Sequence, residues 1–309
     1  MRAPFFAAGL SCLAPAPALA QLCQQGFVHI PLTNQQGEAV AVGESLWIAT
    51  LLGGVVEWNT TTGERRSYTR GRHCLPSDRV HSITVDTGGN VWVATHEGAA
   101  FKPAGSGYET PWIPVALPVP PGRSDYVTTV EAAPDGSVWM GTYDAGCFRR
   151  TPDGAFTRLD PEPHSIAGTF ITGMVFEPDG TLWAGVWGGW LYRYEPGDDA
   201  WTQFTAASTG TPSGLCFPVQ PPEQIGLTSP VLVPIGVDAA GDLWIRCEDD
   251  NPSCRLQTTV RFDGAEWYGY STFNSELPDV HTTGAASGAD GLTYVAGWGG
   301  VAAFDGADF

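Results

Sequence analysis

Charge is scarce in this sequence of 309 residues, and lysine is almost absent. Only 16% of the residues are Asp, Glu, Lys or Arg, and 33 acidic residues against 15 basic ones give a formal net charge of −18. No basic stripe could neutralise the phosphates of a nucleic acid, so we expect no nucleic-acid partner. The acidic surface predicts a soluble molecule that repels its own copies, and the alternative is a surface that binds cations or cationic ligands.

Long helical patterns and long apolar runs are missing as well. Beyond the first twenty residues, no segment is long and apolar enough to predict a bilayer span. Glycine and proline are abundant instead, with 39 and 25 residues. This composition is typical of a turn-rich, all-β protein.

The familiar catalytic motifs are absent. The sequence has no nucleophile elbow, Walker loop, dinucleotide fingerprint or His-Glu-x-x-His motif. It has no Cys-x-x-Cys pair either, which argues against a zinc or redox site. These absences favour a non-catalytic protein over an enzyme.

The first twenty residues have the pattern of a secretory signal peptide. Arg2 supplies a positive charge, a short apolar stretch follows, and Ala18-Leu-Ala20 fits the small-x-small rule for cleavage. We therefore expect residues 1–20 to be a signal peptide and the mature protein to be periplasmic or secreted.

Six cysteines remain after residue 20, and an even number in an exported protein suggests disulfides. Cys247 and Cys254 bracket one loop and are the best candidates for a disulfide. A Cys147–Cys216 disulfide would pin the long, proline-rich connection at 205–229. Six thiols allow 15 pairings, so the connectivity stays open.

A cassette of a turn, Leu or Val, Trp and a strand-like run recurs along the chain. Its aromatic residues are Trp47, Trp92, Trp139, Trp183, Trp244 and, in a sixth copy, Tyr294. They lie 45, 47, 44, 61 and 50 residues apart. A period in this range, built from short strands, predicts the blades of a β-propeller.

Each repeat can be divided into four strands, and Asp-Gly pairs at 135–136, 179–180 and 290–291 mark the first hairpin of three blades. The Trp that follows occupies the same place in each blade. We expect these rings to fill the core between neighbouring sheets rather than to form a ladder that stacks on sugars.

The two ends of the sequence complement each other. Residues 24–32 read as a strand without a blade of its own, and the last repeat stops where its fourth strand would begin. An N-terminal strand in the last blade would close the ring and cover both edges. This predicts one domain over residues 21–309, an all-β propeller of six four-stranded blades. The alternative is a truncated propeller of seven or more blades, a fragment of a larger sensor or adhesin.

One repeat carries a resemblance. It contains Leu75-Pro-Ser77, Val80-His-Ser-Ile-Thr-Val-Asp86 and Gly89-Asn-Val-Trp-Val-Ala-Thr95, and it resembles the two-component-regulator propeller family nearly position by position. In that family the propellers often form periplasmic sensor domains that are thought to bind carbohydrates or to dimerise. The resemblance implies the fold, while no membrane helix or kinase follows in this sequence.

A second resemblance is to the streptogramin lyases, propellers with Asp-Gly-x-x-Trp hairpins. It implies a lyase or hydrolase acting on a cyclic peptide or polysaccharide as the alternative function. His96 and Glu97 would stand for the catalytic His and Glu of that family, which also uses magnesium. The Gly-x-Ile-x-Arg-Ile-x-Pro run of its repeats is missing here.

In a propeller, the loops between the second and third strands share one face with the connections between blades, and ligands usually bind there. We therefore predict a carbohydrate, peptide or protein ligand on this face. The candidate binding residues are His96, Glu97, Tyr143, Asp144, Trp187 and Trp298. Glu248, Asp249 and Asp250 form either a solvated acidic loop or a calcium site, because clustered carboxylates suit hard cations. We otherwise expect no cofactor, and calcium is the alternative.

Overall fold

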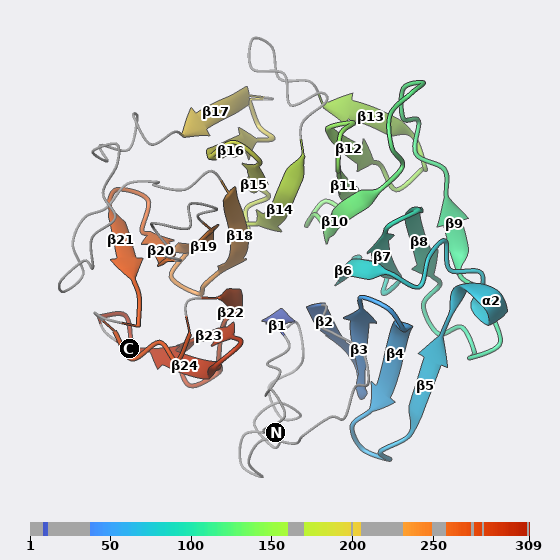
Figure 1. The fold of residues 1–309 in the computed structure, drawn as a ribbon, viewed down its shortest axis with the longest axis horizontal. Helices are drawn as coiled ribbons and strands as arrows, with labels where there is room; N and C mark the ends of the chain where they lie inside the picture. The colour runs from blue at the N-terminus through green and yellow to red at the C-terminus, as the bar shows by residue number, and fades with distance from the viewer. Residues whose placement is uncertain are drawn as a thin grey trace.

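The structure is a computed structural model that describes residues 9–11, 38–159, 170–198, 200–204, 231–248, 258–272, 275–279, 281–307 and 309. Six antiparallel sheets stand around a common axis, with the first strand of each sheet nearest the axis (Figure 1). This arrangement confirms the predicted six-bladed β-propeller.

The blades follow one another in chain order. Blade 1 contains β2 (Glu38–Val42), β3 (Ser45–Thr50), β4 (Gly54–Asn59) and β5 (Arg65–Tyr68). Blade 2 contains β6 (Val80–Val85), β7 (Val91–Thr95), β8 (Gly98–Lys102) and β9 (Ile113–Val115). Blade 3 contains β10 (Val127–Ala132), β11 (Val138–Thr142), β12 (Cys147–Arg150) and β13 (Phe156–Leu159).

The second half of the ring repeats this plan. Blade 4 contains β14 (Ile171–Phe176), β15 (Leu182–Val186), β16 (Trp190–Glu195) and β17 (Ala200–Phe204). Blade 5 contains β18 (Val231–Val237), β19 (Leu243–Glu248), β20 (Thr258–Phe262) and β21 (Trp267–Tyr270). In blade 6 the described strands are β22 (Thr282–Ser287), β23 (Thr293–Gly297) and β24 (Gly300–Phe304).

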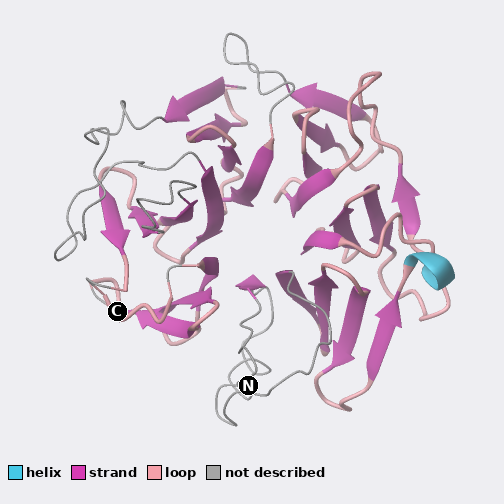
Figure 2. Ribbon diagram, viewed as in Figure 1, coloured by secondary structure: helices cyan, strands magenta, loops and turns pink. Residues whose placement is uncertain are grey.

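The seam of the ring lies between blades 6 and 1. There β1 (Gly9–Ser11) pairs in parallel with β2 and also contacts β22 (Figure 1). The strand expected at residues 24–32 lies outside the described residues. One short helix, α2 (Arg70–His73), lies at the rim between β5 and β6 (Figure 2). None of the helices in the described parts of the chain is long and apolar enough for a membrane span.

The repeated tryptophans are core residues, as predicted. The five rings are between 0% and 8% exposed. In three blades the indole Nε1 donates a hydrogen bond to a carboxylate that comes six residues earlier, at the turn before β7, β15 or β19. The pairs are Trp92 with Asp86 at 2.7 Å, Trp183 with Glu177 at 2.5 Å and Trp244 with Asp238 at 2.9 Å. The motif residues therefore build the scaffold.

A β-bulge recurs near the start of the inner strands, where one extra residue interrupts the register with the second strand. The extra residues are His81 in β6, Thr128 in β10, Thr172 in β14 and Thr283 in β22. Two of the threonines tie their blade to the next one, because Thr128 Oγ1 donates to the Ile171 carbonyl (2.7 Å) and Thr172 Oγ1 to the Leu232 carbonyl. Blade 2 has a histidine in this place.

The two predicted disulfides are not seen. Cys147 and Cys247 are free, buried thiols, and Cys216 and Cys254 lie outside the described residues. Cys147 opens β12 with its side chain in the core between blades 3 and 4, where Sγ lies 3.7 Å from Met174 Sδ. Burial raises the pKa of both thiols to about 12, which disfavours the reactive thiolate.

Candidate functional site

A backbone hydrogen bond recurs at one end of four blades. The first residue after the second strand donates its N–H to the carbonyl of the residue just before the inner strand, over 2.9–3.2 Å. This bond holds two side chains next to each other on the same face of every blade concerned. The pairs are His96 with Arg79, Tyr143 with Tyr126, Trp187 with Phe170 and Trp298 with His281. We call the surface formed by these four pairs the loop face.

Six of the side chains on or next to this face form one continuous row across blades 2, 3 and 4, which we call the aromatic arc. Its members are His81, His96, Tyr126, Tyr143, Phe170 and Trp187. The row includes three of the six predicted ligand-binding residues.

Within blades 3 and 4 the paired rings lie nearly parallel. Tyr126 and Tyr143 have centroids 5.6 Å apart and planes at 10°, and Phe170 and Trp187 have centroids 5.7 Å apart and planes at 13°. Between blades, Tyr143 contacts Phe170 at 5.3 Å. These spacings lie in the range where aromatic rings attract one another, so the rings support each other's orientation.

The arc continues into blade 2 through the two histidines. His96 lies 4.5 Å and His81 4.8 Å from the Tyr126 ring. Burial, His96 and Arg79 lower the pKa of His81 to about 4, so His81 is neutral at pH 7. Its buried Nε2 has no hydrogen-bond partner among the described residues.

Two large rings of the arc are open to solvent. Tyr143 is 50% and Trp187 46% exposed, whereas the repeat tryptophans are at most 8% exposed. Trp187 begins the turn between β15 and β16, in which Gly188 and Gly189 have φ of 109° and 81°. Glycine adopts such angles without strain, so the turn can present a large ring on a tight backbone. A contiguous exposed aromatic surface marks a binding site more strongly than scattered apolar residues do.

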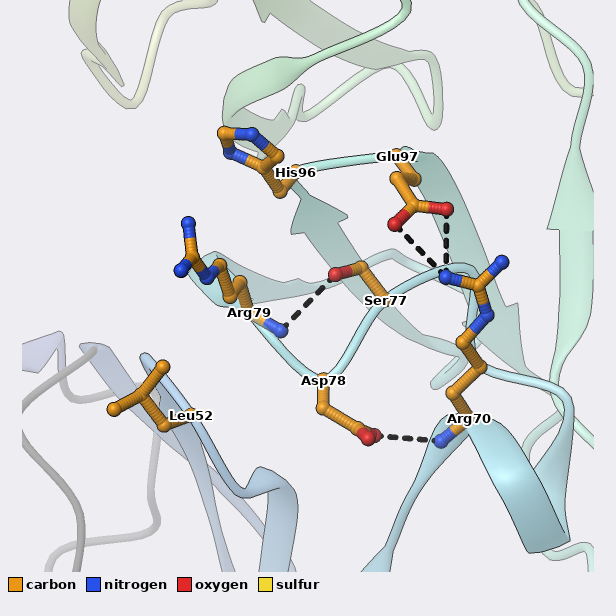
Figure 3. Close-up of a pocket in the computed structure, with 7 residues that line it drawn as sticks. All are labelled: Leu52, Arg70, Ser77, Asp78, Arg79, His96 and Glu97. Atoms are coloured by element: carbon orange, nitrogen blue, oxygen red, sulfur yellow. Dashed lines mark hydrogen bonds and ion pairs between the residues drawn. The ribbon is translucent and has the colours of Figure 1, made fainter.

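An open pocket of about 430 Å³ adjoins the blade 2 end of the arc (Figure 3). It is lined by Leu52, Arg70, Ser77, Asp78, Arg79, His96 and Glu97. Arg70 organises one wall, because its guanidinium pairs with Glu97 at 2.7 Å and its backbone N–H donates to Asp78 Oδ1 at 2.6 Å. Both carboxylates of the pocket therefore have a partner within the protein.

The other predicted site residues take separate roles. Asp144 accepts a hydrogen bond from the Ser124 N–H (2.8 Å) and so fixes the connection into blade 3. Trp298 is 51% exposed and stacks on His281 at 4.3 Å, with the planes at 4°. Within the described residues, no ring contact joins this blade 6 pair to the aromatic arc.

Two of the three residues predicted to bind calcium, Asp249 and Asp250, lie outside the described residues. The third, Glu248, is the last residue of β19. Within the described ranges, no three His, Cys, Asp or Glu side chains come together in a group that could hold a metal ion.

The sequence analysis did not predict four residues of this site as binding residues, namely Arg79, His81, Tyr126 and Phe170. Arg79, Tyr126 and Phe170 immediately precede inner strands, outside the cassette of a turn, Leu or Val, and Trp, and His81 is the bulge residue of β6. Aligning the residue before each inner strand with the residue after the second strand would have found three of them.

Blade 2 carries a family signature. Residues 74–97 match the model of the family described as Two component regulator propeller. This segment is therefore similar to one repeat of that family. The repeat runs from the end of α2 through β6 and β7 and stops at His96 and Glu97, so it covers the scaffold and only the edge of the loop face. No curated protein matches the chain significantly.

Solved structures share the propeller fold. The extracellular domain of a protein described as a hybrid two component system of B. thetaiotaomicron is 18% identical, with a TM-score of 0.61 over 90% of this chain and 34% of that one. PorZ, a surface component of the type-IX secretion system of Porphyromonas gingivalis, is 15% identical, with a TM-score of 0.59 over 86% of this chain and 38% of PorZ.

Virginiamycin B lyase from Staphylococcus aureus is 16% identical, with a TM-score of 0.58 over 89% of this chain and 82% of the lyase. The chain thus spans about a third of the first two proteins and most of the lyase. At these identities the likeness establishes the fold of this chain alone.

Proposed function

We propose that this protein binds a carbohydrate on its loop face without transforming it. The continuous, half-exposed aromatic arc over blades 2–4 carries this proposal. The apolar C–H faces of a sugar pack on aromatic rings, and polar groups at the rim of such a surface bind its hydroxyls. A row of rings from several blades suits a chain of sugars better than a single one.

The polar groups around the arc support binding rather than chemistry. Glu97 and Asp78 are both engaged by Arg70, and Asp144 is engaged by a backbone N–H. A carboxylate that acts as a general acid or base must reach the substrate and be free to exchange a proton, and these three carboxylates are already engaged. The likeness to virginiamycin B lyase keeps a lyase as the second candidate, with His96 and Glu97 as the residues to test.

We also propose that the chain is exported, with residues 1–20 as its signal peptide and a periplasmic or secreted mature protein. Cleavage after Ala20 would remove β1 (Gly9–Ser11) from the seam, so the mature protein would not contain the β1–β2 pair. The two relatives named as an extracellular domain and a surface component support this location. A sensor-like role, in which the bound sugar reports to a partner, would be consistent with the first of these names.

A thermal-shift screen tests the proposed function. The mature chain is melted with neutral and acidic oligosaccharides and with peptide pools, each with calcium and with EDTA. We expect a rise in Tm with one class of oligosaccharide, because a ligand that binds only the folded state stabilises it. A rise with peptides alone would overturn the carbohydrate proposal, and turnover of the stabilising sugar on incubation would favour the lyase.

A further inference from the structure

Arg79 stands at the end of the aromatic arc with its charge uncompensated. It is exposed, and no described residue forms an ion pair or hydrogen bond with its guanidinium. Two hydrogen bonds hold the backbone of Arg79 in place: its backbone N–H donates to Ser77 Oγ (3.2 Å), and its carbonyl accepts the His96 N–H (3.0 Å). In Figure 3 the guanidinium extends beside His96, away from the Arg70–Glu97 pair.

The pocket offers this guanidinium no carboxylate. Asp78 and Glu97 are the acidic residues that line it, and both bind Arg70. The charge of Arg79 instead acts on the arc, where it helps to lower the pKa of His81 and opposes the burial that raises the pKa of Tyr126. Arg79 is thus a cation that acts directly on the arc, in a molecule whose formal net charge is −18.

We propose that the sugar bound along the aromatic arc carries a carboxylate, as a hexuronate residue does, and that Arg79 binds this carboxylate. The inference rests on the proposed carbohydrate function and specifies its ligand class. A guanidinium presents two N–H donors in the geometry of a carboxylate, and such bidentate pairs are strong and selective. The acidic surface repels anions in general, so an anionic sugar needs a cation at the site itself.

The test compares acidic and neutral oligosaccharides of equal length by calorimetry. The probes are tetramers of galacturonate, mannuronate and glucuronate, each also as its methyl ester, which keeps the size and removes the charge. We expect at least one acidic tetramer to bind the wild type about tenfold or more tightly than its ester. Arg79→Gln should abolish this preference and leave the affinity for the ester within about twofold.

Two further variants sharpen the outcome. Arg65→Gln changes the net charge equally on β5, at the outer edge of blade 1, and should keep the preference for the acid. Arg79→Lys should keep part of it, because it retains the charge and loses the bidentate fork. Equal binding of acid and ester, or an unchanged preference in Arg79→Gln, would overturn the inference while the carbohydrate function stood. Binding of neither acid nor ester, or of acidic peptides in their place, would overturn both.

Discussion

Single carboxylates hold neighbouring blades together in this fold. Asp238 shows this most fully, because Oδ2 accepts hydrogen bonds from Trp244 Nε1 (2.9 Å) and from Thr293 Oγ1 of blade 6 (3.2 Å). Oδ1 accepts the backbone N–H groups of Ala240 and Asp242 at 3.0 Å each. The side chain thus fixes a turn, orients a core ring and joins blades 5 and 6.

We expect Asp238→Ala to lower the free energy of unfolding by about 2–4 kcal/mol, since it leaves a buried indole and a buried hydroxyl without their acceptor. Denaturation in urea at pH 7 measures this. Asp290→Ala is the matched control, because Asp290 serves Tyr294 in the same way at an exposed position. An equally large loss of unfolding free energy in Asp290→Ala would contradict the role of burial in this effect.

Lys102 is 2% exposed and anchors the loop between β8 and β9. Its Nζ donates to the carbonyls of Gly107 (2.8 Å) and Thr110, and lies 4.9 Å from the centre of the Tyr68 ring. We expect Lys102→Met to cost about 2–4 kcal/mol of stability, because those carbonyls lose a charged donor. The same denaturation experiment measures this, with the exposed Arg65→Met as the control. A free energy of unfolding equal to that of the wild type in both variants would refute the prediction.

At the scale of the element, the inner strands bring acidic side chains toward the axis of the ring. Glu38 of β2 accepts the Ile83 N–H of β6 at 3.1 Å, and Glu131 comes from β10. Both side chains keep some exposed surface, yet the blades around them displace bulk water. Burial therefore raises the pKa of each carboxyl, and the nearby Glu38 charge raises that of Glu131 further.

This arrangement predicts how stability depends on pH. A raised pKa means that the folded protein retains a proton which the unfolded chain has lost, so stability falls as pH rises above the ordinary range of Glu. We expect Glu131→Gln to be stabilised relative to the wild type, by a difference in Tm that grows between pH 4.5 and pH 8. Taking the difference removes the opposite contribution of His81, whose lowered pKa makes stability rise with pH in the acidic range. A constant difference would contradict the prediction.

The strands were predictable because the repeat itself encodes them. The Asp-Gly pairs at 135–136, 179–180 and 290–291 were expected to mark the first hairpin of three blades, and they lie between β10 and β11, β14 and β15, and β22 and β23. The aromatic arc was only half predictable. Tyr143 and Trp187 follow repeat cassettes, whereas Tyr126 and Phe170 meet them only once the register and the rotation between blades are known.

The uncompensated charge of Arg79 was beyond the sequence for a different reason. Asp78 and Glu97 are near it in the chain, and either could have been its partner. Glu97 instead pairs with the Arg70 guanidinium, and Asp78 accepts the backbone N–H of Arg70, the first residue of α2. Which donor a carboxylate binds depends on positions that only the folded chain defines.

At the scale of the whole molecule, export decides in which compartment the protein would encounter its ligand. When the full sequence is expressed in a host with a secretory pathway, the intact mass of the exported protein should equal that of residues 21–309, and its N-terminal peptide should begin at Gln21. An exported protein that retained Met1 would contradict the assignment of residues 1–20, and replacing Ala18 and Ala20 with bulky residues should block the cleavage.

The central claim is that the aromatic arc binds the sugar, and calorimetry on ring variants with the best oligosaccharide of the screen tests it most directly. Trp190 is the matched control for Trp187, since it lies in the same hairpin, is 39% exposed and has no ring contact among the described residues. We expect Tyr143→Ala and Trp187→Ala each to weaken binding about tenfold or more, and Trp190→Ala to bind as the wild type does. Unchanged affinity in both arc variants, with the fold intact, would contradict the account.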